Sequence, residues 1–342
     1  LGLTPGAFPS VDVFAPPRRG DPNAVPDVAG RQFGVTSFFW TVEEFCAEEL
    51  LPFLFADGED DRAQYTLVVH NVTARLAADA KAVGDGAVNI DGRVVRTFRE
   101  LVEVVHDKID GDDDHERERW AGRAVGQGTV NAFIRRLSGA VRHVEHLVRG
   151  DVPEPDRHRI RDDAQVTVVD LHNLNDRAKR FVVGVVLRKQ FLAKERSGVA
   201  RPLQFVVLDE LNKYAPREGW SPIKEILLDV AERGRSLGIV LIGAQQTASE
   251  VERRIVANSA IRVVGRLDPA EAARGEYGFL PAAQRQRATI IKPGTMVLAQ
   301  PELPVPLMVQ FPFPAWATRA SEAGANPAAV DQPDDPFSGL PT

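Results

Sequence analysis

The stretch that decides the fold is Gln204-Phe205-Val206-Val207-Leu208-Asp209-Glu210. Its continuous apolar run is typical of a strand in a parallel sheet, and two adjacent acids follow at its carboxyl end. In open α/β sheets, ligands bind just outside the carboxyl ends of the strands. One carboxylate there can hold Mg²⁺ while the next polarises a water for attack on a γ-phosphate, the Walker B arrangement. The alternative interpretation is a strand that ends in acids for structural reasons alone.

The segments around this stretch alternate between apolar strands and helices. Helices are expected over about 175–194, from the N-cap Ser221-Pro222 to about Gly238, and from Ser249-x-x-Glu252. This alternation predicts an α/β fold with a mainly parallel sheet that helices cover on both faces. Strands are expected at 11–14, 166–170, 205–208, 239–242 and 261–264, with a closing hairpin at 295–298 and 306–311.

The segment 35–160 has a different, helical pattern. Thr41-Val42-Glu43-Glu44 and Thr97-Phe98-Arg99-Glu100 are capping boxes, and an acidic run between 107 and 118 favours a solvated loop over a cation site. We therefore expect four parts: 1–34, an N-terminal strand and loop of the core; 35–160, a mainly helical insertion; 161–315, the rest of the core; and 316–342, a flexible tail rich in Ala, Pro, Asp and Gly.

The composition excludes several classes of protein. The chain of 342 residues is 44% hydrophobic and 26% charged, which excludes disordered, collagen-like and disulfide-stapled chains. The single Cys46 and the lack of any apolar run of about 18 residues favour a cytoplasmic protein without a membrane span. The net charge of −6 argues against coating by nucleic acid over the whole surface, but it leaves room for a local basic groove or pore.

A polar amide follows the strand expected at 239–242, in Gly243-Ala244-Gln245-Gln246-Thr247. Because this strand is expected beside the Walker B strand, Gln245 can bond the attacking water or the γ-phosphate as a sensor. The alternative is a glutamine that caps the next helix.

The segment from Val206 to Gln246 resembles the HerA branch of the HerA/FtsK ATPases, with Leu208-Asp209-Glu210-Leu211-Asn212-Lys213-Tyr214-Ala215-Pro216 and Glu232-Arg233-Gly234-Arg235 as its core. It extends over roughly 160–315, through Val168-Val169-Asp170-Leu171, Asn258, Val264-Gly265-Arg266-Leu267 and Gly294-Thr295-Met296. The resemblance implies a RecA-like P-loop NTPase core, ATP and Mg²⁺ as cofactors, and a hexameric ring that translocates DNA. It assigns the metal-side acid to Asp209, the catalytic acid to Glu210 and the sensor to Gln245.

The same resemblance matches Arg235 to an arginine that reaches the nucleotide of a neighbouring subunit, with Arg233 as the nearby alternative. A guanidinium there stabilises the charge on the transferring phosphoryl group by a factor on the order of 10³ or more in rate. The alternative role of Arg235 is to neutralise the carboxyl end of its own helix. Arg266 is a weaker candidate for a subunit boundary, and Lys213, Arg217 and Trp220 are candidates for DNA contact.

One departure from the family is that no Gly-x-x-x-x-Gly-Lys-Ser/Thr occurs in the chain, so no residue can be named as the phosphate cradle. With Leu1 as the first residue, this favours a chain that lacks its front piece and is inactive alone. The alternative is a degenerate ATPase.

The expected function is ATP-driven translocation of double-stranded DNA by a helicase-type motor. The resemblance places such a motor in DNA-end processing with a nuclease or in antiphage defence beside an effector protein. Two alternatives remain: a non-catalytic ring that serves as a scaffold for an effector, and a conjugation-type coupling ATPase, which requires a membrane anchor upstream.

Overall fold

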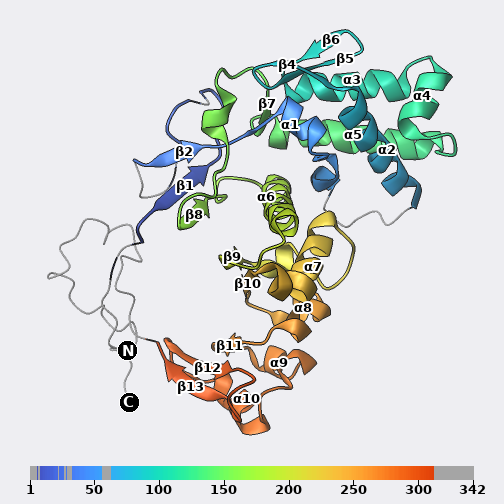
Figure 1. The fold of residues 1–342 in the computed structure, drawn as a ribbon. Coiled ribbons are helices and arrows are strands. Elements are labelled where there is room, and N and C mark those ends of the chain that lie inside the picture. The colour runs from blue at the N-terminus through green and yellow to red at the C-terminus, as the bar shows by residue number, and fades with distance from the viewer. Residues whose placement is uncertain are drawn as a thin grey trace, which may run out of the picture.

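The longer parallel strands of the described residues form two sheets, where the sequence predicts a single mainly parallel sheet (Figure 1). The computed structural model describes residues 6, 8–21, 23–26, 28, 33–55 and 63–311. Within these ranges, β1 (Val11–Ala15) pairs in parallel with both β2 (Val35–Ser37) and β8 (Val166–Val169). β9 (Gln204–Asp209) pairs in parallel with β10 (Ile239–Ala244). The parallel pairing confirms the predicted α/β fold.

An antiparallel sheet lies at the other end of the chain (Figure 1). It consists of β11 (Arg262–Val264), β12 (Thr295–Ala299) and β13 (Leu307–Gln310), and β12 and β13 form the predicted hairpin. Two short helices accompany it, α9 (Pro269–Ala272) and α10 (Ala282–Ala288), whereas Ile255 of α8 (Arg253–Asn258) belongs to the main core.

Two long helices cover one face of the β9–β10 pair. α6 (Asp176–Ser197) begins where the side chain of Asn175 accepts the N–H of Ala178. α7 (Pro222–Leu237) begins where Ser221 caps the N–H of Lys224, as predicted. It ends at Gly238, whose φ of 74° and close approach to the backbone of Ala200 leave no room for a side chain.

The opposite face of β9 is not covered by helices in the described part of the chain. Val206 and Leu208 pack against the main core, whereas Phe205 is 60% and Val207 68% exposed. Successive side chains of a strand point to opposite faces, and α6 and α7 pack together on one of them. The expectation of helices on both faces is therefore met on one face only within the described residues.

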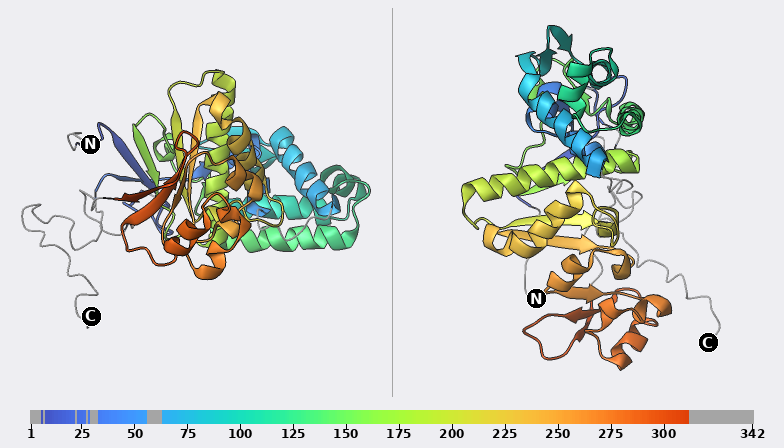
Figure 2. Two further views of the ribbon diagram at one scale, coloured as in Figure 1. Left: turned by 90° about the horizontal axis from the view of Figure 1, so that it is seen from below. Right: turned by 90° about the vertical axis from the view of Figure 1, so that its right-hand side faces the viewer.

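The region 35–160 contains the predicted helices, and α6 separates it from β9 and β10 (Figure 2). Thr41 and Thr97 both form complete capping boxes, as predicted. The α-helices are α1 (Val42–Ala47), α2 (Ala63–Asp79), α3 (Phe98–Asp110), α4 (Asp114–Ala121) and α5 (Gln127–Val144). The main core runs through this region into α6, where the ring of Phe181 meets Trp40 edge-on at 5.3 Å.

The same region contains strands that the sequence pattern did not predict. β4 (Lys81–Gly84), β5 (Ala87–Ile90) and β6 (Arg93–Val95) form an antiparallel sheet, and β3 (Trp40–Thr41) pairs with β7 (Val148–Arg149). β2 also falls inside the range 35–160, although it pairs with β1 of the core. The region is therefore mixed, while its boundaries as a domain stay a prediction.

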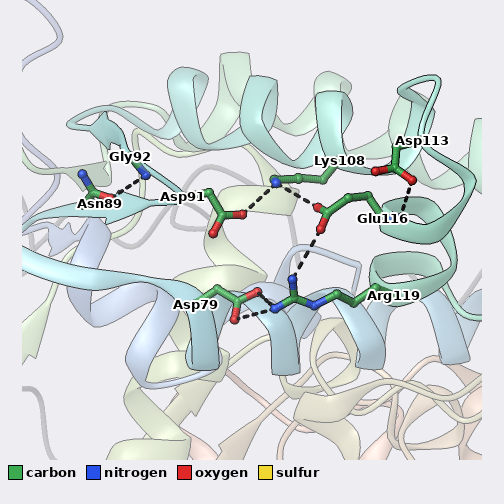
Figure 3. A network of polar contacts seen from close by, with 8 residues as sticks. All are labelled: Asp79, Asn89, Asp91, Gly92, Lys108, Asp113, Glu116 and Arg119. Atoms are coloured by element: carbon green, nitrogen blue, oxygen red, sulfur yellow. Dashed lines mark hydrogen bonds and ion pairs between the residues drawn. The ribbon is translucent and has the colours of Figure 1, made fainter.

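The acidic run is a solvated loop only in its middle, at Asp112 and Asp113, which are exposed between two helices; its remaining acids lie in α3 and α4, which corrects the expectation for those residues. Asp113 caps α4, and Lys108 of α3 lies 2.7 Å from Asp91 and 2.8 Å from Glu116 (Figure 3). Arg119 extends the network to Asp79 at 3.2 Å. These cations compensate the acids and allow two helices to meet there. The described residues hold no group of three or more His, Cys, Asp or Glu side chains arranged for a metal ion.

The predicted helix start at Ser249 is also wrong. Ser249 Oγ donates to Glu271 Oε2 at 2.7 Å, and α8 begins only at Arg253, after the N-cap Glu252. A contact with a distant carboxylate has replaced the local cap. The expected tail 316–342 lies outside the described residues. None of the helices in the described ranges has the length and apolar character that crossing a membrane requires.

Candidate functional site

Two acids stand at the carboxyl end of β9. Asp209 is the last residue of the strand, and its Oδ1 accepts the N–H of Glu210 at 3.0 Å. Glu210 adopts φ 52° and ψ 49°, a left-handed conformation that is uncommon for a residue with a side chain. Such positions cost about 1–3 kcal/mol and cluster at functional sites. Both acids are exposed, so they are open to a ligand.

Lys213 holds the second acid. Its Nζ lies 2.7 Å from Glu210 Oε2 and 3.9 Å from Asp176 Oδ1 in the first turn of α6. The hydrogen bond to Glu210 raises the pKa of Lys213 above its ordinary value. The sequence singled out Lys213 for DNA contact, but in this structure its ammonium group joins the end of β9 to the start of α6.

Gln245 follows the strand beside β9. Asp209 and Ala244 are partners in the parallel register, so Gln245 comes one residue beyond the position of Asp209, at the same edge of the sheet. The short 3-10 helix after it (Ala248–Glu250) has Thr247 as its N-cap residue, and α8 is capped by Glu252. Gln245 therefore caps neither helix, which removes the alternative interpretation, and its sensor role stays a prediction.

The two candidate arginines of α7 differ in their surroundings. Arg233 donates to Glu195 Oε1 at 2.6 Å and lies over the ring of Phe191 at 5.6 Å. Its pKa is raised, first by the hydrogen bond to Glu195. Arg235 is exposed in the last turn of α7 and has no ion pair with any described residue. Arg235 is thus the freer guanidinium, although its place also agrees with neutralisation of the helix end.

The remaining predicted cations are held within the chain. Arg217 donates to the carbonyl oxygen of Ser249 at 3.0 Å and to Glu276 Oε1 at 3.1 Å. Arg266 donates to the carbonyl oxygen of Thr289 at 3.3 Å. In the described part of the chain, none of the five cations except Lys213 forms an ion pair with Asp209 or Glu210. The candidate site within one chain therefore consists of the two acids, Gln245 and Lys213.

The carboxylate of Asp209 suits a Mg²⁺ ion that keeps several water ligands, and not an ion that protein ligands enclose completely. Magnesium binds through one or two carboxylates and keeps several waters, often with substrate phosphates as further ligands. Asp209 offers an exposed carboxylate at the edge where such a ligand set can assemble. The donor set therefore fits Mg²⁺ held together with phosphate oxygens.

Asp176 is a neighbour of this site that the sequence pattern did not predict. The pattern predicted the strand that ends at Asp170 but indicated no role for the acid in the first turn of the next helix. An acid there is an ordinary helix-start signal, so nothing in the pattern separates a residue that reaches Lys213 from one that serves the helix alone.

The sequence matches no family model and no curated protein. Solved structures do share the fold. The plasmid coupling protein TrwB, in complex with ADP and Mg²⁺, aligns over 90% of this chain and 80% of its own, with 13% identity and a TM-score of 0.55. VirB4 of Thermoanaerobacter pseudethanolicus aligns over 90% of this chain and 82% of its own, with 15% identity and a TM-score of 0.53. The RecA-like α/β fold implied by the sequence is therefore confirmed.

Proposed function

We propose that this chain is a motor subunit of a HerA-like ring that couples ATP hydrolysis to translocation along double-stranded DNA. The observation that carries the proposal is the arrangement of Asp209 and Glu210 at the end of β9 with Gln245 at the end of the neighbouring β10. The fold shared with TrwB, whose structure contains ADP and Mg²⁺, supports a nucleotide at this edge.

The residues divide the chemistry among them. Asp209 would hold Mg²⁺, which would supply neutralisation of charge on the phosphate oxygens. Glu210 accepts a hydrogen bond from the attacking water and polarises it toward the γ-phosphate, while Gln245 fixes the position of that water. Lys213 occupies one carboxylate oxygen of Glu210 and makes the carboxylate a weaker proton acceptor, so the release of Lys213 would strengthen Glu210 as the base. The chain contains no Gly-x-x-x-x-Gly-Lys motif, so we assign no residue to the phosphate cradle.

Arg235 acts on the nucleotide of the neighbouring subunit. It is exposed and unpaired among the described residues, whereas Arg233 already binds Glu195. A guanidinium supplied from the next subunit makes hydrolysis depend on ring assembly. Arg266 lies toward the same boundary in this proposal, and the ring is a hexamer.

Contacts with DNA come from the segment after β9, where Lys213 and Arg217 lie and Trp220 is 45% exposed. Such contacts address the phosphate backbone and need no base-specific code. The motor works in the cytoplasm, in DNA-end processing with a nuclease or in defence beside an effector protein.

A second candidate is a conjugation-type coupling ATPase. The specific observation in its favour is the alignment with TrwB, described as a plasmid coupling protein, over 90% of this chain. The two functions differ in the DNA that stimulates ATP turnover. A coupling ATPase should respond to nicked plasmid DNA that carries its relaxase, whereas a HerA-like motor should respond to blunt duplex DNA. A non-catalytic scaffold is the remaining alternative, and it predicts no turnover at all.

The test is the turnover of ATP by the intact protein with and without duplex DNA. Glu210→Gln should abolish turnover and leave nucleotide binding intact, because the amide keeps the shape but cannot accept the proton. The matched control is Glu218→Gln, an exposed acid in the same segment, which should turn over ATP at the normal rate. Unchanged turnover in Glu210→Gln would overturn the catalytic assignment.

A further inference from the structure

A cavity of about 190 Å³ lies where the loops after β1 and β8 meet the end of α5. The residues that matter for its chemistry are Arg18, Arg19, His146, Asn173 and Asn175, which all line it. The carboxyl ends of parallel strands are where α/β sheets place ligands. This cavity, here called the β1–β8 cavity, belongs to different strands from those that carry Asp209 and Gln245.

The charge of the cavity is positive. Arg18 and Arg19 are both exposed, and neither guanidinium has an ion pair with any residue that the structure describes. No acidic side chain lines the cavity among the described residues. Other exposed arginines of the described chain are held by an acid, as Arg233 is held by Glu195. Two adjacent arginines without one leave their donors available to an anion.

The start of α6 adds donors of the same kind. Asn175, which lines the cavity, is the N-cap of this 22-residue helix; its Oδ1 accepts the N–H of Ala178, and its Nδ2 lies 2.8 Å from His143 Nδ1. The first N–H groups of a helix carry partial positive charge and favour anions. Asp176 in the first turn offsets part of this charge, but its carboxylate lies toward Lys213 at 3.9 Å.

The independent sign of a ligand is His146. It is about nine-tenths buried and lines the cavity, and its Nδ1 is buried without a hydrogen-bond partner among the described residues. Burial, followed by the nearby charge of Arg19, lowers the pKa of His146 to about 4, so the ring is neutral at pH 7. A buried polar atom left unpaired costs about 1–3 kcal/mol. A ligand in the cavity contacts this ring, and it recovers that cost once the ring turns Nδ1 toward it.

We propose that the β1–β8 cavity binds a phosphate group, with Arg18 and Arg19 on its oxygens and the start of α6 and His146 completing the site. Each arginine guanidinium can donate two hydrogen bonds to the oxygens of one phosphate group, and the start of a helix adds backbone N–H donors. The phosphate group can belong to a free nucleotide or to the backbone of a nucleic-acid strand. The chemistry of the site is common to both, and the experiment separates them.

The first measurement is binding of inorganic phosphate to the intact protein, followed by calorimetry and by the NMR signals of the His146 ring. Phosphate should shift the His146 signals, and Arg18→Ala/Arg19→Ala should weaken its binding at least about tenfold. Arg18→Lys/Arg19→Lys keeps the positive charge but loses the paired N–H donors of the guanidinium groups. Its affinity for phosphate should therefore be intermediate between those of the parent and of Arg18→Ala/Arg19→Ala. The control pair Arg285→Ala/Arg287→Ala, on α10, should bind phosphate as the parent does.

The second measurement identifies the source of the phosphate. If it is a nucleotide, AMP displaces inorganic phosphate and duplex DNA does not. If it is a nucleic-acid strand, DNA displaces it, and Arg18→Ala/Arg19→Ala lowers the salt dependence of DNA binding by about one to two phosphate contacts. Equal phosphate affinity in the parent and in Arg18→Ala/Arg19→Ala, or His146 signals that phosphate leaves unmoved, would overturn the proposal.

Discussion

Lys213 Nζ lies 2.7 Å from Glu210 Oε2, so an ammonium group from the next turn of the chain holds the second of the two acids that follow the β9 apolar run. The sequence singled out the two residues for different tasks, catalysis for Glu210 and DNA contact for Lys213. Their contact joins the two tasks in one ion pair. A phosphate of DNA that attracts Lys213 would release Glu210, which gives a physical route from DNA binding to hydrolysis.

Lys213→Ala should therefore raise ATP turnover in the absence of DNA. An exposed ion pair of this kind is weak, so the expected rise is up to about fivefold, and the further stimulation by DNA should shrink. The measurement is steady-state turnover by the intact protein with and without duplex DNA. Lys292→Ala, an exposed lysine without an ion pair to any described residue, is the control. A fall in DNA-independent turnover would show that Lys213 supports Glu210 and does not restrain it.

Arg235 should act across a subunit boundary. Arg235→Ala and Glu210→Gln rings should each be nearly inactive, on the order of 10³-fold below the parent. In rings mixed one to one, an Arg235→Ala subunit keeps Glu210 and receives Arg235 from a Glu210→Gln neighbour. About a quarter of the sites then have both groups, so turnover should recover toward about a quarter of the parent value. The readout is turnover against mixing ratio.

The matched comparison for that experiment is Arg233→Ala. Because Arg233 binds Glu195 of its own chain, its loss should lower turnover far less than the loss of Arg235. If assembled mixed rings show no recovery at any ratio, Arg235 serves its own helix end and not the neighbouring nucleotide.

The elements that the sequence predicted correctly are those set by local signals. The apolar run before Asp209 and the caps at Ser221 and Thr97 depend on neighbours in the chain, and all three appear as expected. The common edge shared by Asp209 and Gln245 followed as well, because parallel neighbours end on the same side of a sheet.

The features that the sequence did not predict depend on contacts between residues far apart in the chain. Serine is a common N-cap residue, but the hydroxyl of Ser249 donates to the carboxylate of Glu271. The helical part of the acidic run was missed because Lys108 reaches Glu116 only when α3 and α4 pack, whereas Arg119 pairs with Glu116 within one helix. The contact of Lys213 with Asp176 likewise requires that α6 start beside the end of β9.

Lys224→Met should destabilise the chain strongly. Lys224 is buried, lies 2.7 Å from Glu252, and donates to the carbonyl oxygens of Arg217 and Gly219. Its removal leaves a largely buried carboxylate and two carbonyl groups without their donor, at a cost of about 3 kcal/mol in the free energy of unfolding. Urea unfolding measures the change. Lys292→Met should stay within about 0.5 kcal/mol of the parent, and a Lys224→Met effect that small would contradict the role given to this lysine.

His146 should make stability depend on pH between about 7 and 4. Its pKa is lowered from the ordinary 6.5 to about 4, first by burial and then by Arg19, with Glu145 opposing and Arg149 adding a little. Below pH 6.5 the unfolded ring takes up a proton that the folded ring refuses, so the free energy of unfolding falls as the pH falls. The full effect is about 3 kcal/mol at pH 4, and it is absent above pH 7.

The pH effect is isolated by comparison with His146→Gln, which keeps a polar side chain that does not titrate. Groups that titrate in both proteins cancel, so the difference in unfolding free energy between parent and variant should change steadily from pH 7 to pH 4. Buffers free of phosphate are required, because an anion in the β1–β8 cavity would stabilise the protonated ring and raise its pKa. A difference in unfolding free energy that stays constant from pH 7 to pH 4 would mean that His146 is solvated in the folded protein. That result would also contradict the proposal that a ligand binds at its ring.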